Sequence, residues 1–365
     1  MRVSLHRAAL TYSDGLVLHT ASSGRIEGLD TLYLRLRDGA IDAVGEVRLN
    51  IAYLNGLPAE TVLAEAIETV NGIDFSADPT ALLASAPPTL AAASAPVRML
   101  VDTALHDLRA RRRGLPLAVM LGAPAGAVIA HATNQTLFVS PDETFLDQAG
   151  HYVARGFLDL KVRIGAEAFE GDLRRIALLR ERFGDTVKIA ADANGAWAAS
   201  DATRHLRSLA RYGLSYVEQP IAPGDWPALA ALARETPIPI MLDESVSGLD
   251  DVDRIVDLDT GLMAHLKLVK LGGITPTLEA AARLADAGVP FMIGQMNEGG
   301  LATSAALHVA CVTHPCFAEL YGADGLADDP AAGLDYAAGF VRAPPAPGLG
   351  LAFDASRTRL IREFS

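Results

Sequence analysis

Short apolar runs recur along the chain from about residue 128 onward, and each run ends in a polar side chain. The segments between them carry the apolar spacing of helices, most clearly over 166–183, 199–212, 226–235 and 275–287. Eight runs are found, and their polar ends lie 24 to 31 residues apart: Asn134, Lys161, Asp192, Glu218, Asp243, Lys267, Gln295 and Glu319. This period fits one strand, one helix and two turns, so it predicts a closed barrel of the (β/α)8 type. In such a barrel the chemistry lies at the carboxyl ends of the strands.

An open, doubly wound sheet has the same local pattern of strands and helices. Such sheets commonly carry a glycine-rich phosphate loop, and the chain contains neither G-x-G-x-x-G nor G-x-x-x-x-G-K-[ST]. The pattern therefore favours the barrel.

The first 125 residues differ from the rest of the chain. Residues 1–13, 31–39 and 40–49 predict antiparallel strands, and 59–69 and 95–113 predict helices. We expect a separate α+β domain over 1–125.

Two segments rich in proline complete this organisation. Residues 84–96 are rich in proline and alanine and are interpreted as a connector. Residues 339–353 are rich in proline and glycine, and we expect the C-terminal tail 325–365 that contains them to return to the first domain. The barrel then spans 126–324.

Composition narrows the class of partner. The chain has 365 residues, 50% of them hydrophobic, and 44 acidic against 31 basic side chains give a net charge of −13, which disfavours nucleic acid as a partner. The dense basic cluster Arg109–Arg113 falls in the last turn of a predicted helix, where it complements the helix dipole. The N-terminus lacks a signal-peptide pattern and no stretch is apolar enough to span a membrane. We expect a cytoplasmic protein that binds neither nucleic acid nor membrane.

Three carboxylates end three successive predicted strands: Asp192, Glu218 and Asp243. In a barrel they converge, and three ionised carboxylates would repel one another unless a cation lay among them. Ligands that are all oxygen favour Mg²⁺, with Mn²⁺ as an alternative. Asn194 follows on the same side and can supply a further oxygen or orient a ligand.

Two lysines complete the predicted site. Lys161 and Lys267 end the second and sixth strands, which are opposed in a ring of eight. A cation between two amines suits removal of the proton α to a carboxylate, because the cation neutralises the developing enediolate while a lysine acts as base. We expect burial and the cation to lower the lysine pKa toward neutrality.

At these residues the sequence resembles the enolase superfamily and, within it, the muconate-lactonising-enzyme subgroup. The resemblance covers nearly the whole chain and is carried by GEVRL, GLPAET, LKVRIG, ADANGAW, VEQP, LDES, LKLVKLGG, ELYG and PGLGL. It implies an α/β fold, a (β/α)7β TIM-like barrel with an N-terminal α+β capping domain, and commonly a homo-oligomer. It also implies that Asp192, Glu218 and Asp243 are metal ligands and that Lys267 is the acid or base. Glu298 matches a family acid that assists catalysis.

The chain departs from the subgroup at strand two. The subgroup has Lys-x-Lys with the second lysine as base, whereas this chain has Lys161-Val162-Arg163. Arginine is a poor base at neutral pH, but its charge can depress the pKa of Lys161 or hold the substrate carboxylate. Either Lys161 is the base instead, or Lys267 works alone. This departure favours lyases and cycloisomerases over epimerases, which need an acid and a base on opposite faces.

Two further positions bear on the reaction. Dipeptide epimerases of the subgroup carry Asp-x-Asp after the last strand, where this chain has Glu319-Leu320-Tyr321, which is similar to the cycloisomerases. Glu319 remains as an acid that can meet a substrate amine. The histidine that mandelate racemase carries after strand seven is missing, which disfavours dehydration of sugar acids.

The remaining pocket residues are predicted from the strand ends. Gln295, Asn297 and Glu298 follow strand seven, while Asn134 and Gln135 follow strand one. All five are expected to line the pocket with hydrogen-bonding groups. Capping loops over 13–24 and 50–55 are expected to close over the mouth.

These residues predict a Mg²⁺-dependent enzyme that removes the α-proton of a small carboxylate. The leading prediction is a lyase or isomerase acting on an amino or imino acid, for example a hydroxyproline-type dehydratase. The alternatives are an N-acylamino acid racemase or dipeptide epimerase, a muconate-type cycloisomerase, and a non-catalytic metal-binding relative.

Overall fold

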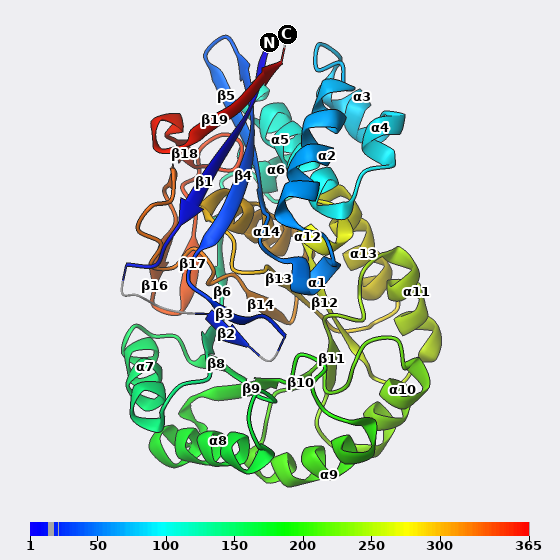
Figure 1. The fold of residues 1–365 in the computed structure, drawn as a ribbon, viewed down its shortest axis with the longest axis vertical. Helices are drawn as coiled ribbons and strands as arrows, with labels where there is room; N and C mark the ends of the chain where they lie inside the picture. Colours follow the sequence, from blue (N-terminus) through cyan, green and yellow to red (C-terminus); the bar gives the residue numbers. More distant parts are fainter. Residues whose placement is uncertain (14–17, 21, 365) are drawn as a thin grey trace.

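The computed structural model describes residues 1–13, 18–20 and 22–364. Figure 1 shows a barrel at one end of the molecule and a domain of strands and helices at the other, where both chain termini lie. Among the described residues, no helix combines the length and the apolar character needed to cross a bilayer.

The barrel is an eight-stranded parallel sheet in which sequence neighbours are also spatial neighbours. Its strands are β7 (Gln135–Leu137), β8 (Asp159–Arg163), β9 (Lys188–Asp192), β10 (Val217–Glu218), β11 (Ile240–Leu242), β12 (Met263–Lys267), β13 (Phe291–Gly294) and β14 (Phe317–Glu319). The amide of Asn134 donates to the carbonyl of Ala318 over 3.1 Å, which links the first and last strands. The sheet is thereby nearly closed into a ring.

One main helix follows each of the first seven strands. These helices are α7 (Asp142–Ala154), α8 (Phe169–Phe183), α9 (Ala199–Leu209), α10 (Trp226–Glu235), α11 (Leu249–Leu258), α13 (Ile274–Asp286) and α14 (Gly300–Thr313), with the short α12 (Leu268–Leu271) after β12. The strands are buried on both faces, as expected of parallel strands covered by helices. The predicted (β/α)7β barrel is confirmed.

The capping domain is built on an antiparallel sheet in the order β19-β1-β4-β5. Its strands are β1 (Arg2–Leu10), β4 (Leu29–Asp38), β5 (Ile41–Arg48) and β19 (Arg359–Phe364). The last strand comes from the C-terminal tail and pairs with β1. Helix α5 (Ala95–Arg112) lies so close to β5 that a Cβ at Gly45 would lie 2.0 Å from the carbonyl oxygen of Leu100. Only glycine permits this approach.

Further helices and small sheets complete the chain. Helices α1 (Ala52–Asn55), α2 (Ala59–Asn71), α3 (Pro79–Ala84), α4 (Pro88–Ala91) and α6 (Leu117–Met120) belong to the first part of the sequence. Two small ribbons pair β2 (Leu18–Thr20) with β3 (Gly24–Ile26) and β15 (Ala331–Ala332) with β18 (Ala352–Phe353), and a three-stranded sheet joins β16 (Asp335–Ala337), β17 (Phe340–Arg342) and β6 (Ala130–Ala132).

Two predictions are corrected by this description. The segment 84–96 is not only a connector, because it contains α4 and the start of α5, each with proline in its first turn, where a missing N–H has no effect. The apolar run 127–138, which was predicted to be the first strand of the barrel, is not one strand. Its first part pairs with β17, and Asn134 and Gln135 come before or at the start of β7 rather than after it.

Candidate active site

The three predicted carboxylates lie together at the barrel mouth. Asp192 ends β9, Glu218 ends β10, and the two are paired in register, while Asp243 follows β11 directly. All three side chains are buried, with residue exposures of 2% or less. Their convergence follows from the barrel geometry, which brings the carboxyl ends of neighbouring strands to one point.

Side-chain cations surround the carboxylates. Lys161 Nζ lies 3.0 Å from Glu218 Oε2 and 3.5 Å from Asp192 Oδ2. Lys267 Nζ lies 2.7 Å from Asp243 Oδ2, and Lys270 Nζ lies 2.5 Å from Asp243 Oδ1. The site is therefore an alternating cluster of buried charges, in which each charge offsets the desolvation of its neighbours.

The pKa directions reflect this cluster. Burial raises the pKa of Asp192 to about 6, against the opposing charge of Arg163. Burial also acts to raise the pKa of Asp243, but Lys267 and Lys270 outweigh it and hold that pKa well below its usual range.

The neighbouring carboxylates raise the pKa of both lysines, whereas the lowering predicted from the sequence depends on a cation beside the lysine. Burial acts to lower the pKa of Lys161, but Glu218 and Glu319 outweigh it and raise the pKa well above its ordinary value. The pKa of Lys267 is likewise raised, chiefly by Asp243 against burial. In this arrangement each lysine holds its proton because a carboxylate lies against it.

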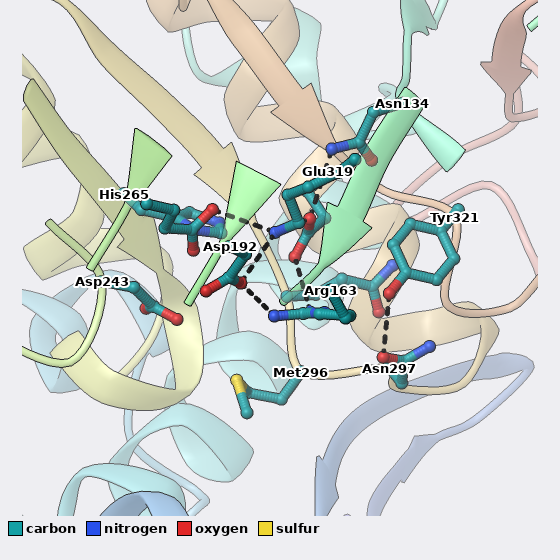
Figure 2. Close-up of polar contacts among 12 residues, drawn as sticks. Asn134, Arg163, Asp192, Asp243, His265, Met296, Asn297, Glu319 and Tyr321 are labelled. Atoms are coloured by element: carbon teal, nitrogen blue, oxygen red, sulfur yellow. Dashed lines mark hydrogen bonds and ion pairs between the residues drawn. The ribbon is translucent and has the colours of Figure 1, made fainter. Parts of the chain in front are cut away.

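The donor chemistry at this point fits a divalent cation. One ligand atom each from Glu218, Asp243 and His265 lies within 4.8 Å of the others. The Asp192 carboxylate is turned toward Arg163, as Figure 2 shows. A set dominated by carboxylate oxygens suits Mg²⁺ or Mn²⁺.

His265 is a site residue that the sequence analysis missed. It lies two positions before Lys267 on β12, is fully buried, and places Nδ1 2.8 Å from Glu218 Oε1. Residues two apart share a strand face, and this spacing from Lys267 was the available signal. His265 lies inside the apolar run, before the polar strand end Lys267 at which the pattern placed the chemistry.

Strand β8 extends further than predicted. Lys161 lies in its middle and Arg163 at its end, opposite Asp192 in the sheet register. The Arg163 guanidinium contacts the Asp192 carboxylate and lies 3.4 Å from Asn194 Oδ1. Both side chains lie on the same face of β8, but Arg163 is nearer the mouth and lines the pocket, whereas Lys161 lies deeper among the carboxylates.

A small pocket opens above the carboxylates. From the barrel it is lined by Phe138, Arg163, Asn194, Asp243, Glu244, Lys267, Gln295, Met296 and Asn297. From the capping domain it is lined by Leu18, Ser22, Ser23, Ile26, Tyr53 and Leu54. Both predicted capping loops therefore reach the mouth, although 14–17 and 21 of the first loop lie outside the described residues.

The loop between β13 and α14 forms one wall of the pocket. Gln295 Oε1 accepts from the amide of Glu298, and Glu298 Oε2 accepts from the amide of Met296. Burial raises the pKa of Glu298 to about 7. Asn297 adopts a φ of 55°, and its side chain bonds the hydroxyls of Tyr12 and Tyr321, each over 3.2 Å.

Three predicted pocket residues are engaged elsewhere. Glu319 contacts Lys161 and accepts from Asn134 Nδ2 over 3.2 Å, as Figure 2 shows for Asn134 and Glu319. Gln135 Nε2 donates to Asp324 over 2.9 Å. Glu319 therefore meets a lysine of the protein where a substrate amine was expected.

Comparison with known proteins identifies the family. The model described as "Enolase C-terminal domain-like" matches residues 144–357. A hydrophobic dipeptide epimerase of Roseobacter litoralis is 30% identical over 90% of this chain and 93% of its own. A chloromuconate cycloisomerase of Pseudomonas putida is 31% identical over 71% of this chain and 70% of its own. The structure of a dipeptide epimerase from Cytophaga hutchinsonii, complexed with Mg and D-Ala-L-Val, aligns with a TM-score of 0.90, 25% identity and coverage of 100% and 99%.

The chain belongs to the enolase superfamily, and it is an enzyme of that superfamily. Within the superfamily its relatives place it in the muconate-lactonising-enzyme family, as the sequence motifs predicted.

Proposed function

We propose that the enzyme removes the α-proton of a small carboxylate with a single base, Lys267. The reaction is completed by making or breaking a bond at the β-carbon, as in cycloisomerisation or β-elimination. One observation carries this proposal: Arg163 lines the pocket at the mouth end of β8, while Lys161, deeper on the same face, is buried among Glu218, Asp192 and Glu319.

The carboxylates Asp192, Glu218 and Asp243 would hold the cation. A cation held there would neutralise charge on the substrate carboxylate, and Asp243, as its ligand, would offset the positive charge of Lys267 less than it does in the ion pair. Lys161 contacts two of these carboxylates and offsets their mutual repulsion. Its role in the proposal is electrostatic.

The two cations that face the pocket have different roles. Lys267 Nζ is held by Asp243 Oδ2 and by Met296 Sδ at 3.2 Å, and it accepts the proton once it is a neutral amine. Arg163 keeps its charge at every working pH, so it stabilises negative charge on the substrate but cannot return a proton to the opposite face.

The names of the relatives suggest the chemical class of the substrate. They are named for dipeptides, for N-succinylated arginine and lysine, and for chloromuconate. All are carboxylates with a substituent near the α-carbon, and we infer a substrate of this class. These relatives give no support to a hydroxyproline-type dehydratase. Hydroxyprolines are therefore kept only as one class of compound in the test.

Racemisation or epimerisation is the second candidate, and one observation favours it: the dipeptide epimerase relative covers nearly the whole chain at 30% identity. That reaction needs a second acid on the face that Arg163 occupies. Homo-oligomerisation and a cytoplasmic location also stay predictions.

The test is incorporation of deuterium from D₂O, followed by mass spectrometry and chiral separation in the presence of Mg²⁺. The substrates are dipeptides, N-succinyl amino acids, muconate lactones and hydroxyprolines of both configurations. We expect exchange in one enantiomer together with a cyclised or eliminated product. Exchange into both enantiomers without such a product would establish the second candidate.

Lys267→Met is the decisive variant, and Lys188→Met, at the exposed start of β9, is its control. The proposal requires exchange to disappear in Lys267→Met and to persist in Lys188→Met. Undiminished exchange in Lys267→Met would overturn the assignment of the base.

A further inference from the structure

Arg48 is a buried cation of the capping domain that reaches the wall of the pocket. It ends β5 and is 1% exposed. A buried guanidinium is costly unless its donors are satisfied, so the identity of its partners is informative.

Its partners are neutral oxygens of two segments. Nη1 donates to the carbonyls of Met296, over 2.5 Å, and of Asn297, over 3.3 Å. Nε donates to Asn50 Oδ1 over 2.8 Å. One side chain of the capping sheet therefore holds two successive carbonyls of the loop between β13 and α14.

That loop needs an external support. Asn297 is a non-glycine residue in the left-handed region, a conformation that persists only where its surroundings hold it. Met296 lies against the proposed base, with Sδ 3.2 Å from Lys267 Nζ. A shift of this loop would therefore move a direct neighbour of Lys267.

The same guanidinium is connected to the capping loops. Asn50 Oδ1 also accepts from the amide of Asp30 over 3.1 Å, and Asn50 Nδ2 donates to the carbonyl of Gly28 over 2.9 Å. Gly28 lies two residues after Ile26, and Asn50 lies three residues before Tyr53; both Ile26 and Tyr53 line the pocket. Arg48 thus joins both capping segments to the loop beside Lys267.

We propose that Arg48 is a positioning residue for Lys267, acting through the carbonyls of Met296 and Asn297. This inference rests on the proposed function in that Lys267 is the base. A planar fork of donors suits two adjacent carbonyls, whereas a lysine ammonium lacks this fixed geometry.

The test compares Arg48→Met, which keeps the apolar stem, with Arg48→Lys, which keeps the charge. Arg35→Met is the matched control, because Arg35 lies in the same sheet and its guanidinium pairs with Asp42. The first measurement is amide hydrogen exchange of peptides covering 295–302, which needs no substrate. Faster exchange there is expected in Arg48→Met, an intermediate rate in Arg48→Lys, and the wild-type rate in Arg35→Met.

The second measurement is the kinetics of α-proton exchange. In Arg48→Met we expect kcat to fall roughly ten- to a hundredfold and to change more than KM, because the base is displaced while the rest of the pocket remains. Arg48→Lys should recover part of kcat. A merely structural role would reduce the yield of folded protein and leave kcat intact, and that result would overturn the inference.

The two proposals fail in distinguishable ways. If the wild-type enzyme exchanges no α-proton, the proposed function fails, while hydrogen exchange over 295–302 still tests whether Arg48 holds the loop. If Arg48→Met does not fold, hydrogen exchange over 295–302 and the kinetics of α-proton exchange are both measured on Arg48→Lys. Wild-type loop exchange together with wild-type kcat in Arg48→Lys would then overturn the inference.

Discussion

His265 donates a hydrogen bond from Nδ1 to Oε1 of Glu218 over 2.8 Å, and this contact joins β12 to a carboxylate of the proposed metal site. Burial lowers the pKa of His265, so the ring is neutral and its single proton faces the carboxylate. Gly294 leaves space for the imidazole ring, because a Cβ at this position would lie 1.9 Å from His265 Nε2. His265 therefore fixes the orientation of Glu218.

We expect His265→Ala to weaken binding of Mn²⁺ by roughly 10- to 100-fold, the usual effect of losing a partner that orients a metal ligand. His265→Asn keeps a side-chain donor and should recover part of the affinity. Titration with Mn²⁺, with free Mn²⁺ followed by electron paramagnetic resonance, measures the dissociation constant of each variant. His205→Ala, on α9 against Phe169, is the control. Equal affinities in all four proteins would show that Glu218 needs no such support.

Arg163→Lys should change the stereochemical outcome. A lysine at this position can lose its proton, so it offers a second base on the face opposite Lys267. We expect deuterium to enter both enantiomers of a substrate that the wild-type enzyme exchanges in only one. Chiral chromatography with mass detection measures the ratio. If the variant keeps one-sided exchange, Arg163 is not what restricts the wild-type enzyme to one face.

The barrel and its carboxylates could be predicted because their signal is local. Even β10, with two residues, was found, since Glu218 interrupts an apolar run at the expected period. The family assignment rested on the same motifs and is confirmed by the comparisons.

The errors occurred where a distant segment decides the local structure. Asn134 was assigned to the end of a strand because its run is continuous, yet Ala130–Ala132 pairs with Phe340–Arg342, some 200 residues later in the chain. Lys161 was assigned to the end of its strand, yet β8 continues to Arg163. Arg163 extends that strand because it pairs in register with Asp192. Periodicity contains no information about such pairings.

Glu46 connects the two parts of the molecule at the start of α14. Its carboxylate accepts from the amides of Gly299, Leu301 and Ala302 over 2.6 to 3.0 Å, so a side chain of β5 satisfies the free N–H groups of a barrel helix.

Removal of this carboxylate should be strongly destabilising. We expect Glu46→Ala to lower the free energy of unfolding by about 2–4 kcal/mol, because buried amides lose their acceptors. Glu46→Gln retains one oxygen and should lose less. Urea denaturation measures both, with Glu363→Ala, exposed on β19, as the control. A loss below about 0.5 kcal/mol in Glu46→Ala, as for an ordinary surface position, would mean that water replaces the carboxylate.

Glu298 should make stability depend on pH around neutrality. Burial raises its pKa to about 7, above its ordinary value near 4.5. Between these values the unfolded chain has released the proton that the folded protein retains. The contribution of Glu298 to stability is therefore fully present below about pH 4.5 and is lost as the pH rises through 7.

Glu298→Gln removes this titration while keeping an oxygen for the amide of Met296. Relative to wild type, the variant should gain stability as the pH rises from 5 to 8, by about 2.5 kcal/mol in total. Urea unfolding at unit steps of pH, in EDTA so that metal binding does not contribute, measures the difference. Glu235→Gln, exposed at the end of α10, should run parallel to wild type. A Glu298→Gln curve that also runs parallel to wild type would mean that Glu298 is already ionised in the folded protein at pH 5.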